Sequence, residues 1–167
     1  MNRLLLALYC LLAYVAAAQT VKSRTLKLAN NAGLFEKLVA GLDAQRLLRI
    51  YQADLKLVQV RRNRHQPAVR DSLLQAVTPA DKIILLKSRY NTLLRSASIA
   101  SARVSFAGFR TGAAQADFCQ QLHLKPGYDE YVVTDGMENF LQLTFSFNNG
   151  KLKRVEYREL VDMDTID

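Results

Sequence analysis

The chain has 167 residues, with 23 Lys or Arg against 15 Asp or Glu, a net charge of +8 and a sequence pI of about 9.7. This length suits one domain that buries a core of its own. Two histidines leave little room for a His/Cys metal site, and we expect no metal ion and no cofactor.

The first 18 residues have the pattern of a secretory signal peptide. Leu4 to Ala18 form an unbroken apolar run of 15 residues, preceded by Arg3 and ended by Ala16-Ala17-Ala18. A helix that spans a bilayer needs about 20 such residues, whereas a signal peptide combines a positive start, a short apolar middle and a small-residue end. A buried N-terminal helix is the alternative, but no polar face interrupts the run. We therefore expect residues 1–18 to be removed, the protein to be periplasmic or secreted, and no transmembrane segment to remain.

Cleavage would leave residues 19–167, in which charge is uneven. Residues 19–98 carry 15 Lys or Arg against five Asp or Glu, and residues 99–167 carry seven against ten. Basic surfaces attract polyanions. For an exported chain we expect a protein or an anionic envelope surface as the partner, and not nucleic acid.

The basic half shows helical periodicity. Leu34, Leu38 and Leu42 repeat every four residues, and Asp43 can cap a second helix that carries Leu47 and Tyr51. Leu55 to Val60 alternates in part, so the end of that helix can be extended instead. Further helices are predicted for 67–77, which starts at a proline, and from Thr78-Pro79-Ala80-Asp81 to about Ser96, where a capping hydroxyl precedes a proline and an acidic residue.

After Ala97 the apolar period becomes two, which indicates strands. Strands are predicted around Val104 and Phe106, around Tyr131 and Val133, over 141–147 and over 151–161, with a short helix from Thr111-Gly112 that turns Phe118 and Leu122 inward. The predicted fold class is therefore α+β: N-terminal helices followed by a small antiparallel β-meander with one short helix. Residues 19–98 form the helical, basic region and 99–167 the meander region of one compact domain.

Asn148-Asn149-Gly150 connects the last two strands. A two-residue loop would set apolar Phe145 opposite Arg154, whereas a three-residue loop sets Leu143 beside Val155 on the apolar face. We therefore predict a three-residue loop with a glycine bulge at Gly150.

Residues 109–161 resemble a known class of small envelope modules. The stretches FRTGAAQADFCQQL and LQLTFSFNNGKLKRVEY are similar to modules of the outer-membrane-assembly lipoprotein and β-lactamase-inhibitor-protein type, in which a short helix precedes a three-stranded meander. The glycine-methionine-threonine helix start of those modules is absent, and Leu124-Lys125-Pro126-Gly127 replaces their Leu-Gly-x-Pro. The resemblance implies protein binding in the cell envelope and assigns no binding residue.

Three clusters raise the question of chemistry. Cys119 and His123 are four residues apart, on one helix face, and a thiolate–imidazole pair can act as nucleophile and base; the alternative is a half-buried cysteine beside a surface histidine. Acidic residues flank a hairpin turn as a candidate acid–base pair or as ordinary turn residues: Asp129, Glu130, Asp135 and Glu138. Asp162, Asp164 and Asp167 are a candidate calcium set that lacks a glycine-centred loop.

The basic segment after Val60 is the strongest candidate site. Four guanidiniums lie within ten residues: Arg61, Arg62, Arg64 and Arg70. Arginine forks bind phosphate and carboxylate groups in pairs of hydrogen bonds, and the alternative is an ordinary solvated turn. We predict a non-enzymatic binding protein of the cell envelope that uses these arginines. A thiol-dependent envelope hydrolase using Cys119 and His123 is the alternative, and a homo-oligomer built through the first helices is a third possibility.

Overall fold

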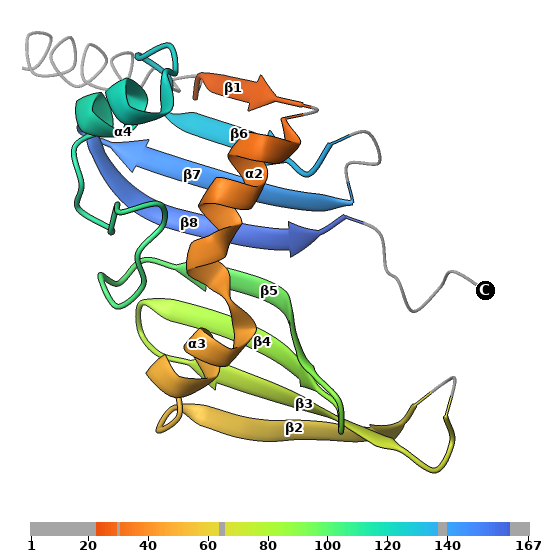
Figure 1. Cartoon of the computed structure of the whole chain (residues 1–167). Helices are drawn as coiled ribbons and strands as arrows, with labels where there is room; N and C mark the ends of the chain where they lie inside the picture. Colours follow the sequence, from red (N-terminus) through yellow and green to blue (C-terminus); the bar gives the residue numbers. More distant parts are fainter. Residues whose placement is uncertain (1–22, 30, 64–65, 137–139, 161–167) are drawn as a thin grey trace, which may run out of the picture.

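The computed structural model describes residues 23–29, 31–63, 66–136 and 140–160. Their dominant feature is one eight-stranded sheet with the order β1-β6-β7-β8-β5-β4-β3-β2 (Figure 1). Its strands are β1 (Thr25–Leu28), β2 (Leu55–Arg62), β3 (Arg70–Val77), β4 (Asp81–Lys87), β5 (Thr92–Ile99), β6 (Glu130–Thr134), β7 (Leu141–Asn148) and β8 (Lys151–Glu159).

Two antiparallel meanders make up this sheet. One runs β2 to β5 and the other β6 to β8, and they join where Ser96–Ile99 of β5 pair with Val155–Arg158 of β8. β1 adds to the outer side of β6 as the only parallel pair among the described strands. The sheet is therefore mixed and continuous across both halves of the chain.

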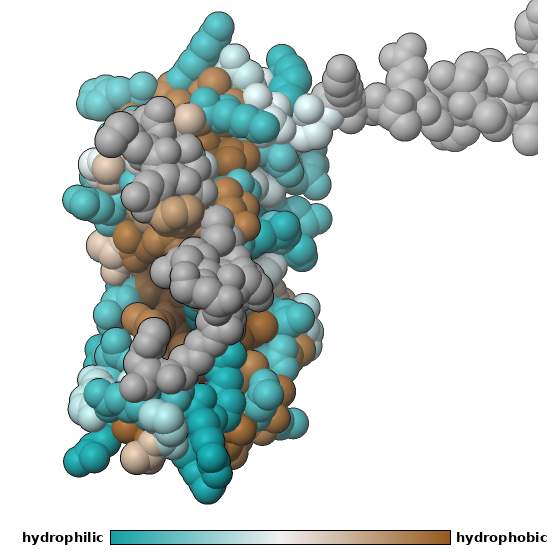
Figure 2. All heavy atoms as spheres, turned by 90° about the vertical axis from the view of Figure 1, so that its right-hand side faces the viewer, coloured by the Kyte–Doolittle hydropathy of each residue, from teal (hydrophilic) through white to brown (hydrophobic). Residues whose placement is uncertain are grey.

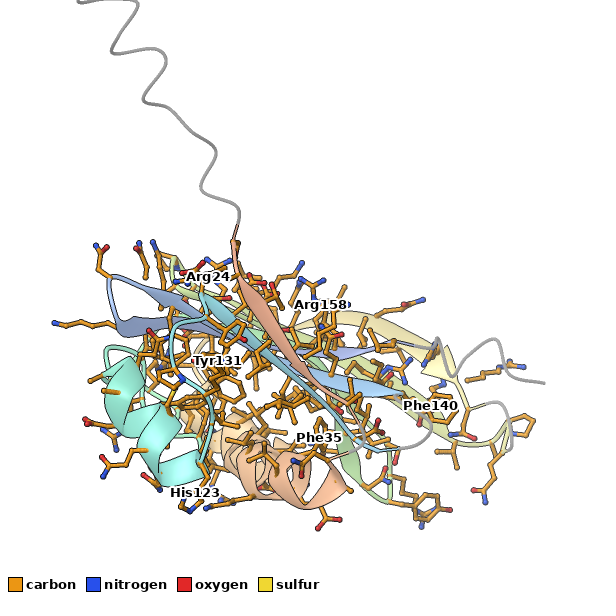
Figure 3. All side chains as sticks on the ribbon, turned by 90° about the horizontal axis from the view of Figure 1, so that it is seen from above. Arg24, Phe35, His123, Tyr131, Phe140 and Arg158 are labelled. Carbon is orange, nitrogen blue, oxygen red and sulfur yellow. The ribbon has the colours of Figure 1, made fainter. Side chains whose placement is uncertain are left out.

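The helices cover one face of the sheet. They are α2 (Ala32–Val39), the 3₁₀ helix η1 (Ala40–Leu42), α3 (Ala44–Ile50) and α4 (Gln115–Leu122). Seen from above, Phe35 and Tyr131 lie between the helices and the sheet, whereas Arg158 lies on the opposite side (Figure 3). The core fills this layer and includes Leu38, Leu47, Ile83, Phe118 and Phe145. Among the described residues, no helix has the length and apolarity needed to span a bilayer.

The predicted fold class, N-terminal helices followed by a small antiparallel β-meander, is wrong, because the chain forms one mixed eight-stranded sheet. Residues 55–99 form four strands in place of the helices predicted over 67–77 and 78–96. In β4, burial alternates from Asp81 to Leu85, which is the period of a strand. Short apolar runs are ambiguous between a buried strand and a buried helix, and here pairing with neighbouring strands decided the outcome.

The helix start predicted at Thr78 is wrong, because Thr78 lies in the turn between β3 and β4. The Thr78 Oγ1 accepts hydrogen bonds from the backbone N–H groups of Ala80 (3.3 Å) and Asp81 (2.9 Å). An N-cap makes the same local bond. In this chain the hydroxyl closes the turn between β3 and β4, so the expected hydrogen bond forms but belongs to a different element.

Several other elements agree with the sequence. α2 and α3 form where predicted, and the Asp43 carboxylate caps α3 by accepting from the N–H of Arg46 (2.7 Å). The segment from Leu55 is extended, which is the alternative that its partial alternation allows. α4, β6, β7 and β8 follow in the predicted order. The predicted strand around Val104 is wrong, because this stretch is a loop in which Phe106 and Phe109 form an isolated bridge.

The predicted hairpin loop is also wrong. Asn148 pairs with Lys151, so the turn has two residues, Asn149 and Gly150, both with positive φ (50° and 69°). An irregularity at Lys153 then shifts the register, so that Phe145 lies opposite Val155. The apolar residues do share one face, as the prediction required, but a bulge in β8 achieves this instead of a longer loop.

Candidate functional site

The four predicted arginines do not form one cluster. Arg62 and Arg70 lie directly opposite each other in the β2–β3 register, on the face of the sheet that carries the helices. Arg61 lies on the other face, opposite Asp71, because successive strand residues alternate. Arg64 lies outside the described residues.

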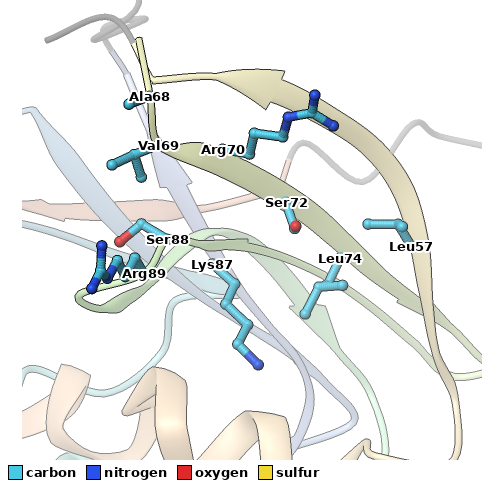
Figure 4. Close-up of a pocket in the computed structure, with 9 residues that line it drawn as sticks. All are labelled: Leu57, Ala68, Val69, Arg70, Ser72, Leu74, Lys87, Ser88 and Arg89. Atoms are coloured by element: carbon cyan, nitrogen blue, oxygen red, sulfur yellow. The ribbon is translucent and has the colours of Figure 1, made fainter. Parts of the chain in front are cut away.

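Arg70 lines a cavity of about 520 Å³ that we call the basic groove. The groove lies over the ends of β2, β3 and β4 and over the turn after β4. Figure 4 shows Ser72 of β3 between Arg70 and Lys87, whose side chains point away from each other, with Leu57 and Leu74 on one side and Arg89 on the other. The described lining residues are Leu57, Ala68, Val69, Arg70, Ser72, Leu74, Lys87, Ser88 and Arg89.

The charge of the basic groove is uncompensated. None of its described lining residues carries a carboxylate. Within the described ranges, Arg62, Arg70, Lys87 and Arg89 make no ion pair, although Arg89 lies 6.0 Å from the ring centre of Tyr90. Like charges directly opposite across two strands are destabilising, so the Arg62–Arg70 pair carries a cost that a bound anion would relieve.

One hydrogen bond joins the two turns beside the basic groove, and two more lie within the β2–β3 turn. The Tyr90 hydroxyl in the β4–β5 turn donates to the Gln66 Oε1 in the β2–β3 turn (3.0 Å). The N–H of Val69 donates to the carbonyl of Gln66 (2.8 Å), and the N–H of Asn63 to that of Val69 (2.9 Å). The two hairpins are therefore tied together beside the lining cations.

Sequence reasoning missed Lys87 and Arg89. Both fall in a predicted helix, where neither would share a face with Arg70. The period of two from Asp81 to Lys87 is the signal that could have found Lys87, because the alternation puts it on the face of Ile83 and Leu85. The strand register that sets Lys87 opposite Ser72 could not be read from the sequence.

A smaller cavity of about 210 Å³ lies on the other face, over the β5–β8 junction. Its lining includes Lys82, Ser96, Ser98, Glu156 and Arg158. The Glu156 carboxylate pairs with Arg158 (2.7 Å), so part of the charge is compensated inside this cavity. The basic groove is larger and has no such internal partner among its described residues.

The candidate thiol pair is not assembled as a catalytic site. Cys119 is 3% exposed, and its sulfur lies 3.1 Å from the Tyr131 hydroxyl, which donates to the carbonyl of Lys125 (3.0 Å). Burial, and then the contact with Cys119, raise the pKa of Tyr131 to about 12. His123 is exposed at the end of α4 with a φ of 54°. The cysteine therefore faces a tyrosine in the core, and the histidine faces away from it.

Two of the acidic candidates, Asp129 and Glu130, have local structural roles, whereas one carboxylate oxygen of Asp135 is buried without a hydrogen-bond partner among the described residues. The Asp129 carboxylate accepts a hydrogen bond from the backbone N–H of Arg24 (2.9 Å). The Glu130 carboxylate accepts one from the hydroxyl of Thr25 (3.2 Å). Both bonds fasten β1 to β6. Glu138 and the aspartates from 162 onward lie outside the described residues. Elsewhere in the described part, no group of three or more acidic, His or Cys side chains is placed to hold a metal ion.

Asp81, which the sequence assigned to a helix start, is a buried carboxylate. Asp81 is 3% exposed and accepts hydrogen bonds from the Tyr51 hydroxyl (2.7 Å), the N–H groups of Ala100 and Ser101 (2.9 Å each) and the Ser101 hydroxyl (2.5 Å). Burial alone would raise the pKa of Asp81, but these bonds outweigh burial and lower it. Asp81 lies inside the fold and joins α3, β4 and the segment after β5.

Comparisons with protein-family models, with curated proteins and with solved structures find no significant match to this chain. Functional inference therefore rests on the sequence and on the described residues.

Proposed function

We propose that this chain is an exported, non-enzymatic binding protein of the cell envelope that attaches to an anionic envelope surface through the basic groove. Export rests on the leader-like pattern of residues 1–18. Binding rests on one observation: three cations, Arg70, Lys87 and Arg89, line a groove whose described residues include no carboxylate.

Two features favour binding over catalysis at this site. The lining supplies positive charge and hydroxyl groups, but no described residue that can serve as a general base at neutral pH. Guanidinium and ammonium groups on a half-open surface suit phosphate and carboxylate groups. The neighbouring Arg62, opposite Arg70, extends this positive surface toward the edge of the sheet.

The test is co-sedimentation with vesicles of phosphatidylcholine, with and without phosphatidylglycerol. The wild-type protein should bind only the anionic vesicles. The double variant Arg62→Glu/Arg70→Glu should bind at least about 30-fold more weakly, because each basic residue near an anionic surface contributes about 1 kcal/mol and the new carboxylates are repelled by that surface. Raising the salt concentration should weaken wild-type binding as well.

The matched control is Lys125→Glu/Lys153→Glu. Both lysines are exposed and neither lines the basic groove, yet the change in net charge is identical. If the two double variants bind equally well, net charge and not the groove directs attachment. If the wild-type protein ignores anionic vesicles, the proposed function is wrong.

A further inference from the structure

The basic groove is the uncovered continuation of the apolar layer between sheet and helices. Across the sheet, Leu85 of β4, Leu74 of β3 and Leu57 of β2 lie directly opposite one another. Leu85 is fully buried, Leu74 is half-buried and Leu57 is 60% exposed. The helices therefore stop covering this row toward the β2 edge, and leucine side chains form part of the groove wall.

Polarity changes row by row along the strands. The next row toward the hairpin turns contains Lys87, Ser72 and Val60, and the row beyond it contains Arg70 and Arg62. At about 3.3 Å per residue, the leucine row and the arginine row are roughly 13 Å apart. Along the backbone, the rows thus change from apolar at the inner end to basic at the outer end, although the Lys87 side chain extends back toward the helices (Figure 4).

Apolar side chains are also exposed outside the core layer. Figure 2 shows a band of apolar atoms through the upper and middle part of the molecule, whereas the lower part, where β2 and β3 lie (Figure 1), is mostly hydrophilic. Leu57 and Val60, which are 60% and 47% exposed, come from the β2 edge strand. A free phosphate would use the cations and leave these apolar side chains in water.

We propose that the basic groove binds a single anionic lipid-like amphiphile, with its acyl chain along Leu57 and Leu74 and its anionic head group at the guanidinium of Arg70. This inference rests on the proposed function, since it uses the same groove, and it adds that one acyl chain leaves the membrane plane to enter the protein. Charge complementarity requires an anionic head group, and the exposed leucine row requires an apolar chain.

The experiment is isothermal titration calorimetry of the exported form, residues 19–167. The ligands are alkyl phosphates from ethyl to decyl, each kept below its critical micelle concentration. Each methylene that enters the groove should tighten binding about fourfold, since burying one contributes about 0.8 kcal/mol. Inorganic phosphate and ethyl phosphate should bind weakly and alike.

Three variants locate the chain and the head group. Leu57→Ser should weaken decyl phosphate about tenfold and leave ethyl phosphate unchanged. Arg70→Gln should weaken every alkyl phosphate by a similar factor. Val77→Ser is the matched control, because Val77 is 62% exposed on the other face of the same sheet, and it should change nothing.

The outcomes separate the two proposals. Affinity that does not depend on chain length, with anionic vesicles still bound through Arg62 and Arg70, would overturn the amphiphile and leave surface attachment standing. Chain-length dependence that Val77→Ser abolishes and Leu57→Ser does not would place the acyl chain elsewhere and also overturn it. Absence of binding to both vesicles and decyl phosphate would remove both proposals.

Discussion

Asp81 shows how much one side chain organises in this molecule. Its carboxylate is almost fully buried and accepts hydrogen bonds from Tyr51, Ala100 and Ser101. Burial, and then the bond to Asp81, raise the pKa of Tyr51 above its ordinary value. Arg103 lies over the Tyr51 ring, 4.4 Å from its centre, and pairs with Asp54 (2.7 Å). Three segments distant in sequence therefore meet at one charge.

We expect Asp81→Asn to lower the free energy of unfolding by about 2 kcal/mol at neutral pH, because bonds to a charged acceptor are lost and an amide N–H₂ meets other donors. The folded-state pKa of Asp81 is lowered, so its contribution is present above the unfolded-state pKa of about 3.9 and is lost as the pH falls through the folded-state pKa. Urea unfolding as a function of pH tests this. The wild-type protein and the variant should converge at acid pH, and a constant difference would contradict the assignment.

At the scale of elements, η1 packs unusually closely on the loop after β5. A Cβ atom built on Gly41 would lie 2.1 Å from the carbonyl oxygen of Ser105 and 3.2 Å from the Cα of Phe106. Both neighbours are backbone, which cannot rotate away as a side chain can. The absence of a side chain at Gly41 therefore sets the distance between the helical layer and this loop.

Gly41→Ala should destabilise the protein by about 1–3 kcal/mol through overpacking. Gly33→Ala is the control, because Gly33 lies in α2 and a Cβ atom there would meet no other atom within 4 Å. Alanine at this position should be neutral or stabilising by up to about 1 kcal/mol. Thermal unfolding followed by circular dichroism compares the two, and equal melting temperatures would show that the loop yields without cost.

The whole molecule depends on the junction between its two meanders. Four residue pairs join β5 to β8, and Tyr157, opposite Ala97, is buried at this junction. On the helix side, one core cluster includes Leu47 and Ile83 of the first half and Phe118 and Phe145 of the second. Because sheet and core are both shared, the halves should unfold together.

Tyr157→Ala should lower the free energy of unfolding by about 3–5 kcal/mol, and the loss should appear equally in β4 and in β7. Amide hydrogen exchange followed by mass spectrometry measures both strands in one experiment. Arg154→Ala, an exposed change on the same strand, should stay within about 0.5 kcal/mol. A loss confined to β7 would mean that the halves are separate folding units.

The success of prediction differed between the two halves for a physical reason. In β7, the alternation of apolar and polar residues from Leu141 to Phe147 fits a strand and not a helix. After Asp43, apolar residues recur at helical spacing, so the cap and the spacing both indicated a helix. In residues 70–87, apolar residues come in adjacent pairs such as Leu73-Leu74 and Ile83-Ile84. Such pairs fit the apolar stripe of a helix as well as they fit a strand whose two faces are both partly covered. The capping pattern at Thr78 then favoured the wrong choice.

The candidate site was predictable only in part. Arg62 and Arg70 were named from the density of guanidiniums, and both lie at or beside the basic groove. Lys87 and Arg89 were not, because they come from a different hairpin, and Arg61 was grouped with the first two although it lies on the other face. Local spacing carries no information on which strands become neighbours.

By itself, the sequence determined the uneven charge, the leader-like start, the Asp43 cap and the alternating strands of the second half, because each depends on residues close together in the chain. Only the tertiary structure decided that 55–99 are strands, that Asp81 is a buried acceptor, and that three cations and two leucines share one groove. These features depend on register between distant segments, where the free energy of pairing and burial exceeds the small local preferences of each residue.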